Sequence, residues 1–148
     1  MSAAQGGIAI STIDETTLLA YLRTRYRVLC DPPITLRIGE RSAALAALLH
    51  ARGADCAAFL TAWNPRGELF TAPANADAQR ALRAELAARG HAVVAGIGED
   101  PDGHWPGEDS VLVPGLGYAE AVAVAEAFGQ NALVWAGADA RPQLVLLR

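Results

Sequence analysis

The sequence predicts an α+β domain in which helices pack on a mixed or antiparallel sheet. Two observations support this fold class: apolar residues with helical spacing alternate along the chain with short β-prone runs, and Gly or Pro marks most of the boundaries between them. With 148 residues, of which 52% are hydrophobic and 19% charged, the chain has the length and composition of one globular domain. We therefore expect residues 1–148 to form a single domain.

The segment before residue 26 predicts one helix. Residues 1–10 are rich in Gly and Ala and show no periodicity, so we expect them to be a mobile lead-in. Ser11 and Thr12 each stand three residues before an acid, which is the spacing of a capping box, and apolar residues then recur at helical intervals. We expect a helix that ends near Arg25.

The next segment predicts a hairpin and a second helix. Residues 26–30 and 34–38 are β-prone runs around a Pro-rich turn, and the second run alternates apolar and polar residues. Ser42 is a suitable N-cap, a Leu stripe with helical spacing follows it, and Gly53 is a suitable C-terminal stop. Together with the first helix, these elements form an N-terminal extension to the rest of the domain.

Residues 56–136 predict the order β-α-β-β-α-β, which is the order of the ferredoxin-like fold. Strands are expected at residues 56–63, 92–97, 111–113 and 133–136, and helices at residues 73–90 and 121–129. An apolar run at residues 144–147, after a turn, is expected to add a C-terminal strand that pairs as a hairpin.

Composition and charge exclude several classes of protein. A formal net charge of −4 and an isoelectric point near 5.3 argue against nucleic acid as a partner, because phosphate binding needs a basic surface. The first basic residue is Arg23 and the apolar runs are far shorter than the roughly 20 residues that cross a bilayer, so neither a secretory signal nor a membrane segment is expected. Cys30 and Cys56 have no metal-binding spacing, so we predict a cytoplasmic protein with reduced thiols and no cofactor.

A polar and aromatic corner, Trp63-Asn64-Pro65-Arg66, lies where a predicted apolar strand runs into a loop. Asn64 offers a hydrogen-bond donor and an acceptor from one amide, Trp63 a flat stacking face, and Arg66 a fork for a carboxylate or phosphate. These groups make the corner a candidate binding site. The alternative interpretation is that Trp63 belongs to the core and the Asn-Pro pair only starts a turn.

A second candidate is the acidic segment from Glu99 to Ser110, which packs five acids, a His and a Trp into a predicted loop between two strands. A calcium-binding EF-hand is excluded, because counting from Asp100 puts Trp105 at the sixth position and Val111 at the twelfth, where Gly and Glu are needed. Weak candidates for a looser metal site are Glu99, Asp100 and Asp102. Candidate general acids or bases are Glu99, Glu108 and His104. The alternative is a solvated acidic turn.

Arginines on the predicted hairpin form a third candidate site. Arg25 and Arg27 are two residues apart and share a face of their strand, and Arg37 lies on the polar side of the partner strand. They could form an anion-binding ridge. The alternative is the solvent side of an edge hairpin whose arginines pair with acids from elsewhere in the chain.

These motifs together resemble a bacterial family, domain of unknown function 3293. The segments that carry the resemblance are Arg25-Tyr26-Arg27-Val28, Thr35-Leu36-Arg37, Phe59-Leu60-Thr61-Ala62-Trp63-Asn64-Pro65, Asp100 with Trp105, Glu108 and Ser110, and Phe128-Gly129-Gln130-Asn131-Ala132. They extend over nearly the whole chain. The sequence departs from the family at Ala74, where an acid is expected, so no cap or ligand contact is assigned there. The resemblance implies no activity, but it marks these motifs as common features of the family.

We expect a small-ligand binding domain with a polar and aromatic pocket at strand ends. The candidate ligand-binding residues are Trp63, Asn64, Arg66, Trp105, Glu108, Ser110, Gln130 and Asn131. The alternatives are an enzyme that uses the loop carboxylates for acid-base or metal-assisted chemistry, and a protein-interaction module that uses the arginines of the hairpin.

Overall fold

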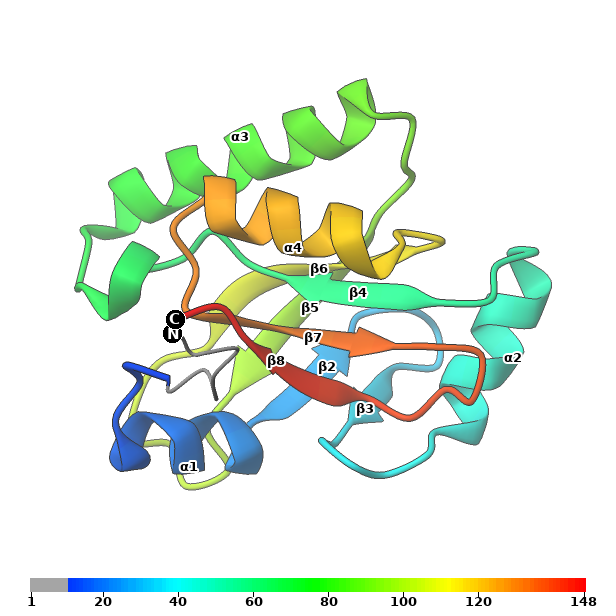
Figure 1. The fold of residues 1–148 in the computed structure, drawn as a ribbon, viewed down its shortest axis with the longest axis horizontal. Helices are drawn as coiled ribbons and strands as arrows, with labels where there is room; N and C mark the ends of the chain where they lie inside the picture. The colour runs from blue at the N-terminus through cyan, green and yellow to red at the C-terminus, as the bar shows by residue number, and fades with distance from the viewer. Residues whose placement is uncertain (1–10) are drawn as a thin grey trace, which may run out of the picture.

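The computed structural model describes residues 11–148, which form a seven-stranded sheet and four α-helices (Figure 1). In chain order the elements are α1 (Glu15–Arg23), β2 (Arg25–Val28), β3 (Ile34–Leu36), α2 (Ala43–Ala51), β4 (Ala57–Leu60), the 3-10 turn η1 (Pro65–Gly67), α3 (Ala72–Ala88), β5 (Val94–Glu99), β6 (Glu108–Pro114), α4 (Tyr118–Ala127), β7 (Ala132–Ala136) and β8 (Gln143–Leu146). The lead-in expected at residues 1–10 lies outside the described residues.

The strands are ordered β3-β2-β5-β6-β4-β7-β8, and every neighbouring pair is antiparallel. The predicted α+β class with an antiparallel sheet is therefore confirmed. The C-terminal strand β8 pairs with β7 as a hairpin, as the sequence predicted. Among residues 11–148, no helix combines the length and the hydropathy that crossing a membrane requires.

Helices α3 and α4 cover one face of the sheet (Figure 1). The side chain of Thr71 caps α3 by accepting a hydrogen bond from the backbone N–H of Ala74, and Leu82 and Leu86 on the buried side are fully inaccessible. Each such Leu contributes about 1.5–3 kcal/mol by leaving water. They pack in one cluster with α4 and with outward residues of the central strands, among them Leu60 and Val111.

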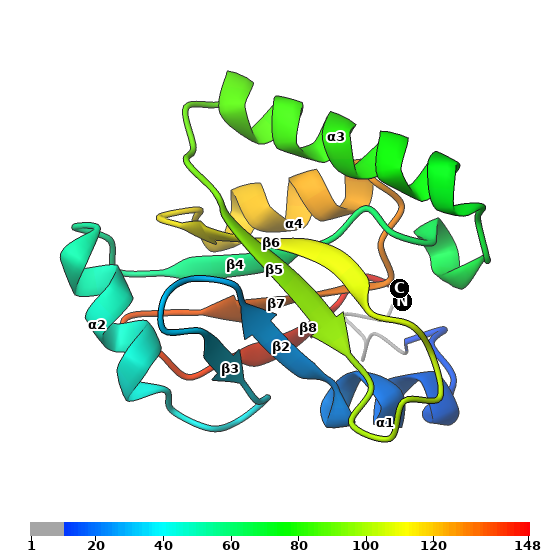
Figure 2. The same ribbon diagram turned by 180° about the vertical axis from the view of Figure 1, so that it is seen from behind.

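Helices α1 and α2 belong to the other face of the sheet, where they lie at opposite ends in both views (Figures 1 and 2). The side chain of Ser42 caps α2 as predicted, and α2 buries Leu45 and Leu49 in the second core cluster. By contrast, α1 contains no fully buried residue. The α2 end of this face is therefore closed by a packed core, whereas α1 is only loosely packed at its end.

The first turn of α1 differs from the prediction. The N-cap is Asp14, whose carboxylate accepts the backbone N–H of Thr17 at 2.7 Å, and neither Ser11 nor Thr12 caps the helix. Ser11 Oγ instead accepts the N–H of Ile13 in the turn before the helix. The expected cap at Ser11 or Thr12 is therefore wrong: Asp14 directly precedes the helix, and its carboxylate reaches the exposed N–H groups of the first turn.

The acidic segment also differs from the prediction. Strand β5 extends to Glu99 and β6 begins at Glu108, so the loop comprises residues 100–107 only. Glu99 pairs with Arg27 on the neighbouring strand and Glu108 lies opposite Gly98 in the β5–β6 register. Charged residues can occupy the ends of strands because the hydrogen bonds between neighbouring strands are made by backbone groups, so the side chains do not compete for them.

Candidate functional site

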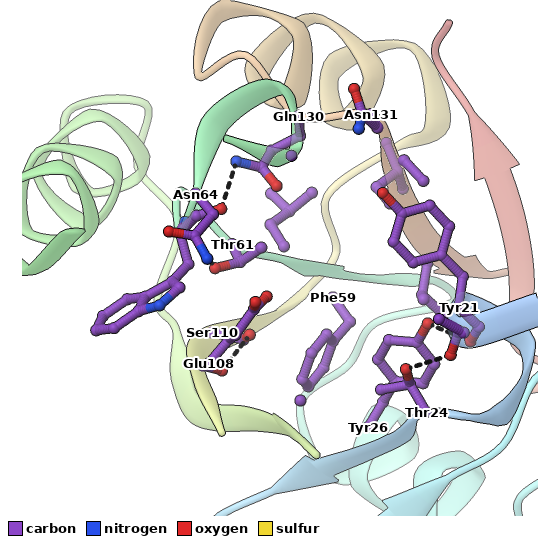
Figure 3. Close-up of a pocket in the computed structure, with 18 of the residues that line it drawn as sticks. Tyr21, Thr24, Tyr26, Phe59, Thr61, Asn64, Glu108, Ser110, Gln130 and Asn131 are labelled. Carbon is purple, nitrogen blue, oxygen red and sulfur yellow. Dashed lines mark hydrogen bonds between the residues drawn. The ribbon is translucent and has the colours of Figure 1, made fainter. Parts of the chain in front are cut away.

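A cavity of about 300 Å³ lies between α1 and the sheet (Figure 3). Its walls come from α1, from β4 and the loop after it, from the end of β5, from loop 100–107 with the start of β6, and from the connection between α4 and β7. Its apolar floor includes Tyr26, Phe59 and Val134, which also belong to the core cluster of the α2 face. The cavity therefore occupies the end of this face that α1 covers loosely.

Seven of the eight candidate ligand-binding residues line this one cavity. They are Trp63, Asn64, Trp105, Glu108, Ser110, Gln130 and Asn131. The eighth, Arg66, is exposed in η1 with a φ of 58°, and its backbone N–H donates to the carbonyl of Gly129 at 2.7 Å. The Arg66 backbone thus joins two walls of the site, but its guanidinium is not part of the lining.

Asn64 is held in place by Asn75 of α3. The Asn64 side-chain oxygen accepts from Asn75 Nδ2 at 2.8 Å and from the N–H of Phe70 at 3.0 Å, while Asn75 Oδ1 accepts the N–H of Asn64 at 2.8 Å. The φ of Asn64 is 46°, a left-handed conformation that Asn tolerates better than most residues. Because its oxygen is used twice, the amide N–H₂ group is the part of Asn64 left for the cavity.

Asn75 was not among the candidates from the sequence, although it is 1% exposed and determines how Asn64 is oriented. The sequence does contain a pattern that indicates this role. Asn75 and Gln79 share the helical face of Leu82 and Leu86, and side-chain amides on a buried apolar face need hydrogen-bond partners. Gln79 uses its oxygen to accept the N–H of Ala62 at 3.0 Å, which anchors the start of the same loop.

Glu108 is the acidic residue of the lining. Burial raises the pKa of its carboxyl above the ordinary value, and the Asn64 amide acts in the opposite direction. Among residues 11–148, none of the ion pairs includes Glu108. Figure 3 shows Glu108 and Ser110 projecting from β6 towards the space between Asn64 and Tyr21.

Aromatic side chains are concentrated in the lining. Of the nine Phe, Trp and Tyr residues in the chain, five line the cavity: Tyr21, Tyr26, Phe59, Trp63 and Trp105. The Phe59 ring lies against Gly96, where an added Cβ would stand 2.8 Å from Phe59 Cε2, and it makes an edge-to-face contact with Tyr26 at 5.4 Å. Gly96 therefore gives Phe59 the space to form the floor of the cavity.

The Tyr26 hydroxyl attaches the α1 wall to the sheet, and the Thr24 hydroxyl caps the end of the helix. Tyr26 Oη donates to the carbonyl of Tyr21 at 2.7 Å, and Thr24 Oγ1 donates to the carbonyl of Ala20 at 2.7 Å (Figure 3). Burial raises the pKa of the Tyr21 hydroxyl, while the Asn131 side chain acts to lower it. Tyr21 was not among the candidates from the sequence, because its helical spacing does not show what that side of the helix faces.

The hairpin arginines lie elsewhere. Arg25 and Arg27 alternate with the buried Tyr26 and Val28, so they share the face of β2 opposite the cavity. Arg27 Nη1 is 3.3 Å from Glu99 Oε1. Arg37 follows the end of β3. None of the three lines the cavity.

The metal candidates also lie outside the cavity, and they form a different group from the one expected. Potential ligand atoms of Asp100, Asp102 and His104 lie within 4.8 Å of one another, and Glu99 is not part of this group. Although burial acts to raise it, hydrogen bonds from the backbone N–H groups of Asp102 and His104 hold the pKa of Asp100 below its ordinary value. Arg23 pairs with Asp102. These contacts account for Asp100 as part of the turn and for Asp102 as an ion-pair partner of α1.

A family model described as "Protein of unknown function (DUF3293)" matches residues 60–133. This span contains all seven candidate residues that line the cavity, whereas the α1 wall lies before it. No curated protein and no solved structure matches the chain.

Proposed function

The chain belongs to the DUF3293 family of proteins of unknown function, and we propose that it binds a small molecule in the cavity between α1 and the sheet. The observation that carries this proposal is that side chains from distant parts of the sequence line a single cavity. Aromatic, amide and carboxyl groups that are far apart in the sequence, such as Trp63, Glu108 and Asn131, meet in one cavity. Its volume of about 300 Å³ is at the lower end of the range of about 300–1,000 Å³ for small-molecule sites.

The lining also has the mixed character of a binding site. Its apolar floor would bury the body of a ligand, and the polar groups stand at fixed places around it. Asn64 is held by Asn75, and Gln130 Nε2 lies 3.3 Å from the carbonyl of Phe128 and 3.4 Å from that of Trp63. Groups fixed in this way lose little conformational freedom when a ligand binds.

We infer that residues 56–136 have the ferredoxin-like arrangement. The strand order β7-β4-β6-β5 within the sheet, with α3 and α4 on one face, supports this inference. In this arrangement the two helices leave the other face of the sheet uncovered, and α1 and α2 of the N-terminal extension lie over it. The cavity would then be formed jointly by the N-terminal extension and the ferredoxin-like core.

The test uses the indole N–H signals of the three Trp residues in NMR spectra during titration with a library of cationic, neutral and anionic aromatic fragments. Trp63 and Trp105 line the cavity, whereas Trp135 donates its indole N–H to the carbonyl of Leu116 at 3.0 Å and serves as the internal control. We expect binding fragments to shift the signals of Trp63 and Trp105 and to leave that of Trp135 unchanged.

A matched pair of variants assigns these shifts to the cavity. Gly98 lines it, and a Cβ there would meet Thr24 Cγ2 at 3.7 Å, an ordinary contact, so Gly98→Ala should fold and retain binding. Gly98→Leu fills the space and should abolish binding while the Trp135 signal keeps its position. Fragments that bind Gly98→Leu as well as they bind the wild type would disprove the proposed site.

Glu108 favours a second candidate function, an enzyme with Glu108 as its acid or base. Of the three candidate acids or bases from the sequence, Glu108 lines the cavity and has a raised pKa, whereas Glu99 pairs with Arg27 and His104 lies outside the lining. Turnover of a bound ligand that Glu108→Gln abolishes would favour the enzyme over the binding protein.

The interaction role of the arginines, the absence of nucleic acid partners and the cytoplasmic location stay predictions.

A further inference from the structure

The lining of the cavity contains an acidic side chain and no basic one. Glu108 is the only Asp or Glu among the lining residues, and the lining contains no Arg or His. The chain has no Lys at all, and residues 1–10 carry no basic side chain. Any cation that meets Glu108 inside the cavity therefore has to come from outside the lining.

Several other acidic residues among residues 11–148 have a cationic partner, which Glu108 lacks. Asp77, Glu85 and Glu99, for example, each have an Arg within ion-pair distance. The guanidinium of Arg148 reaches the lining only through Asn131, to whose Oδ1 it donates at 3.1 Å. Glu108 is thus a partly buried carboxylate without a cationic partner among residues 11–148.

Aromatic rings complete the surroundings of this carboxylate. Tyr21, Trp63 and Trp105 line the same cavity as Glu108, and the faces of such rings attract cations through their quadrupoles. The Asn64 amide acts on the Glu108 carboxyl, and the Glu108 charge acts on the hydroxyl groups of both Tyr21 and Tyr26, whose pKa values it helps to raise. An ammonium group in this position would meet one negative charge and several π faces, whereas an anion would meet uncompensated repulsion from Glu108.

We propose that the ligand of this cavity is a small organic cation, an amine whose ammonium group pairs with Glu108 and whose apolar part lies on the floor around Phe59. This inference rests on the proposed function, because it names the class of ligand for the same site. The cavity has the volume of about ten water molecules at the roughly 30 Å³ that each takes in the liquid, so the ligand is of the size of a substituted aromatic or aliphatic amine.

The experiment compares three probes of similar shape and different charge: 2-phenylethylamine, 2-phenylethanol and phenylacetate. Binding to the full chain at pH 7 is followed through the indole signals of Trp63 and Trp105, with Trp135 as the control. The amine should bind at least about tenfold more tightly than the alcohol, and phenylacetate should bind more weakly than either. Glu108→Gln should remove the advantage of the amine while the alcohol binds as before.

A pH series adds a readout that a purely structural role of Glu108 would not give. Affinity for the amine should fall as the pH is lowered through the raised pKa of Glu108, and this dependence should be absent in Glu108→Gln. If the alcohol binds as tightly as the amine, or if Glu108→Gln leaves the preference intact, the cation proposal is wrong and the small-molecule site stands. If none of the probes, and no fragment of the wider library, shifts Trp63 and Trp105, both proposals fail.

Discussion

At the scale of single residues, the orientation of a side chain in this site depends on partners that are distant in the sequence. Asn64 turns its amide towards the cavity because Asn75, eleven residues later, occupies its oxygen. In addition, the backbone N–H of Asn64 donates a hydrogen bond to the side-chain oxygen Oδ1 of Asn75. Such a reciprocal amide pair, shielded from water, has few alternative arrangements, and this makes it a fixed reference point for the site.

The charge of Glu108 should cost folding stability at neutral pH. Because burial raises its pKa in the folded state, the contribution of Glu108 is most favourable below the pKa of the unfolded chain and is lost as the pH rises through the folded pKa. Glu108→Gln should therefore raise the free energy of unfolding at pH 7 and change it little at pH 4, measured by urea denaturation at both values.

The exposed carboxylate of Glu68 provides the control for this measurement. Glu68→Gln should leave the free energy of unfolding unchanged, within about 0.5 kcal/mol, at both pH values. A Glu108→Gln variant that gains the same stability at pH 4 as at pH 7 would show that its effect comes from packing and not from charge.

At the scale of elements, α1 is the part of the site that the core holds least firmly. It has no fully buried residue, and Leu19 and Leu22 on it are exposed by 50% and 41%. Its attachment relies on the Tyr26 hydroxyl, which donates to the carbonyl of Tyr21 in its last turn, and on the ion pair of Arg23 with Asp102 in the loop after β5. Elements with few buried apolar contacts open at a lower free energy than the core, so α1 is where we expect local opening of the cavity.

Tyr26→Phe should loosen α1 selectively. The variant keeps the ring that packs on Phe59 and removes the donor to the carbonyl of Tyr21, which should lower the free energy of unfolding by about 0.5–1.5 kcal/mol. Hydrogen exchange of the α1 amides should become faster, while exchange in β4 and β6 changes only as the global stability does.

Tyr118→Phe is the matched control, because Tyr118 is half-exposed on α4 and its edge-to-face contact with Trp135 does not use the hydroxyl. It should change neither the stability nor the exchange of α1. Equal exchange rates for α1 in Tyr26→Phe and in the wild type would mean that the Tyr26 hydroxyl does not hold this helix.

At the scale of the whole molecule, the sheet separates a face that is packed throughout from a face that holds the cavity. The cluster under α3 and α4 is apolar and tightly buried, whereas the other face has a packed end under α2 and the cavity under α1. Central strands such as β4 contribute to both, because successive side chains point to opposite faces: Ala58 and Leu60 pack under the two long helices, and Phe59 forms the floor of the cavity. Stability and ligand binding should therefore be separable by mutation.

Leu82→Ala tests this separation. Leu82 is completely buried in the α3 cluster, so the truncation should cost about 2–5 kcal/mol of unfolding free energy in thermal or urea denaturation. In buffer where the variant is still folded, fragment affinities measured through Trp63 and Trp105 should stay within about twofold of the wild type. Leu22→Ala on the exposed side of α1 should change stability by less than about 0.5 kcal/mol. Loss of binding in folded Leu82→Ala would show that the two faces are coupled.

Much of the local structure was determined by the sequence alone. Ser42 and Gly53 bound α2 as predicted, and the alternation in residues 34–38 gave strand β3 and its buried side. The polar residues of the cavity could be named for a similar reason, since Trp63, Asn64 and Gln130 are unusual choices at the ends of apolar strands. These are short-range signals, carried by the chemistry of neighbouring residues.

Only the tertiary structure decided which of these residues meet. The sequence predicted a ligand contact at Arg66 and none at Tyr21, Phe59 or Asn75, yet these three build or support the cavity and Arg66 does not line it. Which side of a helix or strand faces a cavity depends on strand pairing and on how α1 docks, and both bring together residues separated by dozens of positions. A local pattern shows that a face is apolar, but the partner of that face is set by the packing of the whole chain.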